Sequence, residues 1–255
     1  MIEVHFLGVG EAFDENLPNT SILIRFEVND SLITLLLDCG FTAPPQFWKK
    51  SLPADALDGV WISHFHGDHC FGLPALLLRL WEEKRKKDLI IIGGKGIDAF
   101  TRNALDLAYP GFYEKLGFSI GFVEVEPNKE SEIFGLSFRA AQNNHSQRDL
   151  ALRIDGGGRS IYYSGDGRPT PECVALARGS RLIIHEAYHP TTEFPGHGTV
   201  RGCFDMAIKC EAKILALVHI QKDVRQEVIA WLKGAPAFEG SLNVIIPEPG
   251  FSIRL

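Results

Sequence analysis

Apolar and polar positions alternate along the chain in the way expected of strands interleaved with helices. Apolar runs at 2–7, 21–28 and 32–37 open the chain, and the polar turn 29–31 predicts a hairpin between the last two. Further runs of strand length predict strands at 89–92, 120–125, 136–141, 150–154, 160–163, 182–185, 213–218 and 242–246, the last of the chain. Helical spacing and stop signals predict helices at 41–50, 71–87, 96–108, 171–178, 199–211 and 221–232. This order predicts an α/β fold with two stacked sheets flanked by helices.

The helix at 71–87 ends in a run of charged residues. Its apolar stripe includes Leu73, Leu76 and Leu80 at helical spacing. The run 82–87 (EEKRKK) places cations where the helix dipole favours them, which predicts a solvated helix end. An RNA-binding patch is the alternative for this run.

The densest chemistry lies in residues 64–69, which read HFHGDH and follow the apolar run 59–62. In an extended segment His64 and His66 point to the same side, so they can converge on one point. Asp68 and His69 lie past the turn at Gly67 and should face a second point. Two neighbouring foci of imidazole and carboxylate predict a two-metal site. A polar loop without such a role is the alternative, but only nine histidines in 255 residues make this grouping unlike chance.

Three further candidate ligands each follow a predicted strand, as His64 does. They are His145, Asp166 and His219. Loops at one edge of a sheet bring together side chains from distant parts of the sequence. Any one of these residues alone would be an ordinary loop residue, but their matching positions favour a shared metal site.

Glu186 and His197 form a candidate acid–base pair. Glu186 follows a predicted strand, and His197 stands between two glycines that allow a close approach to a ligand. A carboxylate bonded to an imidazole fixes its tautomer and raises its basicity, which suits a general acid. Two unrelated surface residues are the alternative. No role is assigned to His185 or His189, and Cys70 is expected to be a buried thiol rather than a ligand.

Length, charge and cysteine content limit the domain number, the partners and the compartment that we expect for this protein. A length of 255 residues suits one large α/β domain or two small ones, and no linker marks a break, so we expect one domain over 1–255 built from two similar halves. The net charge of −6 argues against a broad nucleic-acid surface. We expect no membrane partner, because no apolar run approaches the ~20 residues that a bilayer needs. Five scattered cysteines and no export signal predict reduced thiols and a cytoplasmic protein.

The motifs described above resemble those of a known protein family. The HFHGDH motif, with His145, Asp166 and His219, resembles the metallo-β-lactamase superfamily. The segments 163–169 (YSGDGRP), 185–187 (HEA) and 197–199 (HGT) resemble the branch that holds ribonuclease Z and related cyclic-nucleotide and phosphonate-pathway phosphodiesterases. The openings 6–10 (FLGVG) and 37–40 (LDCG) also resemble that branch.

The resemblance implies a four-layer αββα sandwich with two Zn²⁺ ions in an edge cleft. It implies one ion held by His64, His66 and His145, a second held by Asp68, His69 and His219, and Asp166 bridging them. A hydroxide bridging the metals would attack phosphorus, with Asp68 helping to take its proton. His197, oriented by Glu186, would protonate the leaving oxygen. Manganese or iron would fit the same ligands.

The chain departs from ribonuclease Z in ways that bear on its substrate. The tRNA-gripping arm of that enzyme lies between the positions of His145 and Asp166, where this chain has only a short strand–turn–strand. Gly167 and Tyr188 stand where threonines are usual in the family.

The leading hypothesis is therefore a phosphodiesterase for a small or cyclic phosphodiester, or a short nucleic-acid end. A ribonuclease Z-type tRNA 3′-endonuclease is the second, a metal- or ligand-sensing binding protein the third, and the family implies a homodimer.

Overall fold

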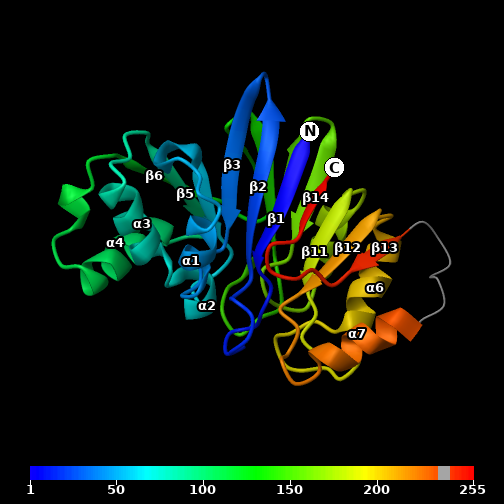
Figure 1. Ribbon diagram of the computed structural model, residues 1–255. Helices are drawn as coiled ribbons and strands as arrows, with labels where there is room; N and C mark the ends of the chain where they lie inside the picture. Colours follow the sequence, from blue (N-terminus) through cyan, green and yellow to red (C-terminus); the bar gives the residue numbers. More distant parts are fainter. Residues whose placement is uncertain (235–241) are drawn as a thin grey trace.

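The structure, a computed structural model, describes residues 1–234 and 242–255. Within these residues two seven-stranded sheets lie face to face, with helices on their outer sides (Figure 1). The predicted α/β fold with two stacked sheets is confirmed. No helix of the described residues combines the length and apolar composition needed to cross a bilayer.

The first sheet has the order β14-β1-β2-β3-β4-β5-β6. Its strands are, in that order, Ser252–Arg254, Ile2–Gly8, Ser21–Val28, Ser31–Leu37, Gly59–Ile62, Leu89–Gly93 and Ile120–Glu124. Pairing is antiparallel from β14 to β3 and parallel from β3 to β6. Helices α1 (Ala43–Trp48), α3 (Leu73–Glu82) and α4 (Ile97–Ala108) cover its outer face.

The second sheet has the order β13-β12-β11-β10-β9-β8-β7. Its strands are, in that order, Asn243–Ile245, Ile214–Val218, Leu182–Glu186, Arg159–Tyr163, Leu150–Gly156, Leu136–Gln142 and Glu130–Ile133. Pairing is parallel from β13 to β10 and antiparallel from β10 to β7. Helices α5 (Pro171–Ala177), α6 (Val200–Lys209) and α7 (Arg225–Gly234) cover its outer face.

Side-chain alternation divides the strand residues between an inner core and two outer cores. In β1, Val4 and Phe6 point into the core between the sheets, whereas Leu7 packs under the helices. In β4, Trp61 points inward, and Val60 packs outward against the helices. Strands buried on both faces read as continuous apolar runs, which is why the sequence reveals them so clearly.

Two short strands escaped the sequence pattern. β7 and β14 are edge strands of four and three residues, and most of their side chains are exposed or half-buried. An edge strand needs backbone pairing more than apolar side chains, so its sequence carries little signal. The prediction that the strand near 242–246 is the last in the chain is wrong, because β14 follows it and pairs with β1.

The predicted helix at 71–87 is shorter than expected. A one-turn helix, α2 (Gly67–Cys70), comes first, and α3 ends at Glu82. Lys84 then adopts a φ of +60°, which turns the chain out of the helix. Arg85 is buried, with an exposed fraction of 1%, and donates to the carbonyl oxygens of Lys87, Ala54, Leu57 and Asp88. The expected solvated helix end is therefore wrong for Arg85, and that side chain is not available to RNA.

We expect Arg85→Ala to lower the free energy of unfolding by about 3 kcal/mol, because it leaves buried carbonyl groups without donors. Urea unfolding followed by circular dichroism measures the change. Arg79→Ala is the matched control, since Arg79 is an exposed helix arginine that pairs with Glu82 and Glu83 and lies over the Trp48 ring, but bonds no buried carbonyl group within the described residues. Equal losses for the two variants would contradict a stabilising role for the Arg85 bonds.

Candidate metal centre

The predicted ligands gather where parallel strands of both sheets end. His64 and His66 follow β4 of the first sheet, and α2 carries Asp68 and His69. In the second sheet β10, β11 and β12 run parallel, and Asp166, Glu186 and His219 lie at or just past their carboxyl ends. Parallel strands deliver the side chains after them to one edge, so residues more than 150 positions apart become neighbours.

The first cluster contains three imidazoles. The Nδ1 atom of His66 lies 3.0 Å from Nε2 of His64 and 3.1 Å from Nε2 of His145. These three residues form a group able to hold a metal ion. In a tetrahedral zinc site with Zn–N bonds of about 2.0 Å, neighbouring ligand atoms are roughly 3.3 Å apart. The observed spacing therefore suits one ion with an open fourth position.

The second cluster mixes imidazole and carboxylate. Nε2 of His69 lies 3.2 Å from Oδ2 of Asp68 and 3.4 Å from Oδ2 of Asp166. Nε2 of His219 lies 3.3 Å and 3.4 Å from the same two oxygens. The other Asp166 oxygen, Oδ1, is buried and accepts no hydrogen bond from the described residues. A buried carboxylate oxygen without a donor fits a carboxylate that binds a second cation.

Two buried aspartates orient the histidines from behind. Asp38 accepts hydrogen bonds from Nδ1 of His69 at 2.7 Å, from the Tyr163 hydroxyl at 2.6 Å and from the Ser63 backbone N–H and hydroxyl at 2.8 Å. Asp149 lies 3.1 Å from Nδ1 of His64. Each contact directs the opposite ring nitrogen, Nε2, toward the cluster.

Sequence reasoning gave neither aspartate a role. Asp38 belongs to the motif 37–40, so a signal for it existed in the sequence. Asp149 has no comparable signal, because its contact with His64 arises only from tertiary packing.

A glycine with a positive φ makes room for Asp149. Gly165 has a φ of +62°, and a Cβ atom there would lie 2.4 Å from Oδ1 of Asp149 and 2.8 Å from the Cβ of Ser63. The turn between β10 and Asp166 therefore requires glycine for both conformation and space.

Burial and neighbouring charges set the protonation of the cluster. Burial lowers the pKa of His64 to about 3, so this ligand is neutral. Burial opposes charge on His219, but Asp166, Asp68 and Glu186 outweigh it and raise its pKa to about 9. Burial also opposes charge on Asp166, yet His219 and His69 hold its pKa well below the usual range. The carboxylates of the second cluster thus attract positive charge, which protons on the imidazoles supply here and which a bound cation would supply in their place.

Glu186 and His197 meet at the border of the metal ligands. Oε2 of Glu186 lies 3.4 Å from Nδ1 of His197, and Oε1 accepts hydrogen bonds from the backbone N–H groups of Gly167 and Gly198 at 2.8 Å each. The Tyr188 ring stacks on His197 at 4.4 Å and 24°. Burial opposes charge on His197, but its bond to Glu186 raises the pKa of the imidazole. With Nδ1 engaged, Nε2 is the nitrogen left to meet a ligand.

Three neighbours of these motifs lie outside the clusters of the described chain. His185 is buried, and its Nδ1 lies 2.7 Å from the Glu186 carbonyl oxygen. Nδ1 of His189 accepts a hydrogen bond from the Thr192 N–H. The Cys70 thiol donates to the His66 carbonyl oxygen at 2.9 Å, and burial raises its pKa to about 12. A neutral thiol bonded in this way suits a structural role.

Known proteins share this architecture. Ribonuclease Z from Shouchella clausii is 26% identical over 317 residues, covering 100% of this chain and 97% of that protein. The structure of the short form of human tRNase Z has a TM-score of 0.77 and 24% identity, covering 99% of this chain and 98% of that one. The metallo-β-lactamase fold protein YhfI from Bacillus subtilis has a TM-score of 0.76 and 19% identity, with coverage of 99% and 98%.

The protein is therefore a metal-dependent hydrolase with the metallo-β-lactamase fold, and the predicted resemblance is confirmed. A family model described as "Anti-Pycsar protein Apyc1" matches residues 2–231. This match covers most of the chain, so the protein belongs to the Apyc1 family.

We expect Asp38→Asn to weaken metal binding about 10- to 100-fold, because His69 loses the carboxylate that orients it. Competition with a chromogenic chelator measures the affinity. Asp205→Asn is the control, since Asp205 is exposed on α6 and pairs only with Arg201 in the described structure. Unchanged affinity in Asp38→Asn would remove Asp38 from the metal centre.

Proposed function

We propose that this protein is a dinuclear phosphodiesterase that hydrolyses a small or cyclic phosphodiester, with His197 as general acid. One observation carries the proposal: the Glu186–His197 pair lies beside two clusters of metal-ligating atoms. The ligand atoms of His145, Asp166 and His197 lie within 4.8 Å of one another. A proton donor at that distance from the metal ligands suits a reaction in which an oxygen leaves phosphorus.

Two zinc ions are the proposed cofactors. His64, His66 and His145 would hold one, Asp68, His69 and His219 the other, and Asp166 would be shared between them. Imidazole-rich sites without redox chemistry suit zinc, although manganese or iron fits the same atoms. When bound, the ions supply Lewis acidity that activates water and neutralises the phosphate charge. The Asp68 carboxylate, which lies among the ligands, would accept the proton that the attacking water loses.

The roles of His197 and Glu186 follow from their contacts. Glu186 holds Nδ1–H of His197 and favours the protonated ring, so Nε2–H can be donated to the leaving oxygen. Glu186 is itself fixed by the N–H groups of Gly167 and Gly198. The proton donor is therefore positioned before substrate binds.

A small substrate is favoured over precursor tRNA by what lies between His145 and Asp166. That stretch consists of the β9–β10 hairpin, whose turn is formed by Gly157 and Gly158 with positive φ. It contains no insertion large enough to form an arm. The chain carries a net charge of −6, and its family description differs from that of ribonuclease Z. The curated relatives named ribonuclease Z keep tRNA 3′-end cleavage as the second candidate.

We expect His197→Ala to retain its metal and to lower kcat by roughly 10²- to 10⁴-fold, the usual contribution of a general acid. The loss should be larger for an alkyl phosphodiester than for a bis-nitrophenyl ester, because a nitrophenolate leaves without a proton. Steady-state hydrolysis and elemental analysis measure both effects, with His189→Ala as control. Full activity of His197→Ala on both esters would exclude the acid role.

We expect Asp166→Ala to lose bound metal, because the second cluster then lacks one of its two carboxylates. Elemental analysis after dialysis measures the loss, and Asp205→Asn should keep the parent's content.

A substrate screen tests the wider proposal. The zinc- or manganese-loaded protein should hydrolyse cyclic or linear phosphodiesters and leave precursor tRNA uncut in a gel assay. Turnover of a lactone or thioester with no phosphodiester activity would reject the phosphodiesterase. Cleavage of precursor tRNA at its 3′ end would favour the second candidate.

A further inference from the structure

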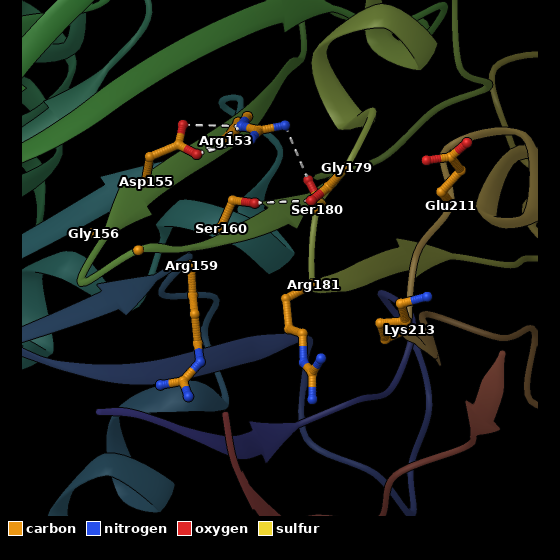
Figure 2. A pocket seen from close by; sticks show the side chains of 11 residues that line it. Arg153, Asp155, Gly156, Arg159, Ser160, Gly179, Ser180, Arg181, Glu211 and Lys213 are labelled. Carbon is orange, nitrogen blue, oxygen red and sulfur yellow. Dashed lines mark hydrogen bonds and ion pairs between the residues drawn. The ribbon is translucent and has the colours of Figure 1, made fainter. Parts of the chain in front are cut away.

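A basic cavity lies at the end of the second sheet opposite the metal centre. It measures about 560 Å³ and is lined by residues of β9, the β9–β10 turn and the segments that lead into β10, β11 and β12 (Figure 2). The metal ligands follow the carboxyl ends of β10–β12, whereas this cavity lies at their amino ends. A five-residue strand such as β11 separates the two sites by roughly 15 Å, so one small ligand cannot occupy both.

The cavity carries an excess of positive charge in an acidic protein. Arg153, Arg159, Arg181 and Lys213 line it, against the two carboxylates of Asp155 and Glu211. The Asp155 carboxylate already binds Arg153 and also Arg139. Asp155 therefore does not neutralise the guanidinium groups of Arg159 and Arg181, which form no ion pair within the described residues.

Two arginines lack partners within the described chain. The Arg159 and Arg181 side chains make no hydrogen bond or ion pair there, and Figure 2 shows them extending in the same direction. Their backbones are close, because the N–H of Arg181 donates to the carbonyl of Ser160 at 2.9 Å. Both guanidinium groups line the same cavity, and a phosphate that accepts hydrogen bonds from both would relieve the repulsion between their charges.

The floor of the cavity is rigid, and its rim is open. Arg153 donates to the carbonyl oxygens of Leu176 and Arg178 and to Asp155, so it is fixed in place. Gly158 and Gly179 have φ angles of +72° and +71°, and a Cβ atom on either would meet nothing within 4 Å. The backbone turns at these glycines therefore leave space for a ligand.

We propose that this cavity is a second ligand site, distinct from the metal centre, that binds a small phosphorylated molecule of nucleotide size. The volume lies within the range of small-molecule sites, and the arginines supply the forked donors that phosphate recognition uses. A cavity rather than a stripe of cations favours a small ligand over an RNA strand.

Calorimetric titration of the zinc-loaded protein with adenosine 5′-monophosphate tests the proposal. We expect Arg159→Ala/Arg181→Ala to weaken binding at least tenfold, because both charges lie on the surface and their loss should not unfold the protein. Arg201→Ala, an exposed arginine of α6, is the matched control and should bind as the parent does. In NMR spectra of the parent, the amides of Gly158 and Gly179 should shift on titration.

The outcome is separable from the proposed phosphodiesterase. The double variant should hydrolyse a bis-aryl phosphate at the parent's rate, because neither arginine belongs to the metal centre. Absence of saturable binding in the parent, or equal affinity in the parent and the double variant, overturns the second site. Loss of precursor-tRNA binding in the double variant, without loss of nucleotide binding, also overturns it and makes the surface an RNA contact.

Discussion

The buried carboxylate of Asp38 connects the two sheets at the edge where the metal ligands meet. It accepts hydrogen bonds from Ser63 and His69 of the first half and from the Tyr163 hydroxyl at the end of β10. A buried charge without such donors would cost several kcal/mol, so the donors and the carboxylate hold each other in position. The separation of the sheets and the direction of the His69 ring thus depend on the same group.

Much of the fold was predictable because its strands are buried on both faces. The runs at 21–28 and 182–185 are apolar enough to reveal their strands, and the positions of His64, Asp166 and His219 after strands indicate a common edge. The roles assigned to these ligands and to Glu186 and His197 remain predictions, although the structure brings all of them together.

What could not be predicted depends on contacts between distant residues. Asp149 contacts His64 across 85 positions, and no local spacing signals that pairing. Arg85 lies in a run of charges that resembles a solvated surface, yet carbonyl groups from 54 and 57 enclose it. Periodicity reports which face a residue occupies and says nothing about such partners.

The C-terminal strand has a consequence for how the two halves depend on each other. β14 belongs by chain order to the second half, but it forms the edge of the first sheet beside β1. The last strand of the chain therefore pairs with the first, and the two ends lie next to each other in Figure 1. A fragment that holds only the first half would expose the backbone of β1 as an unpaired edge, so this edge of the first sheet is completed only by the second half of the chain.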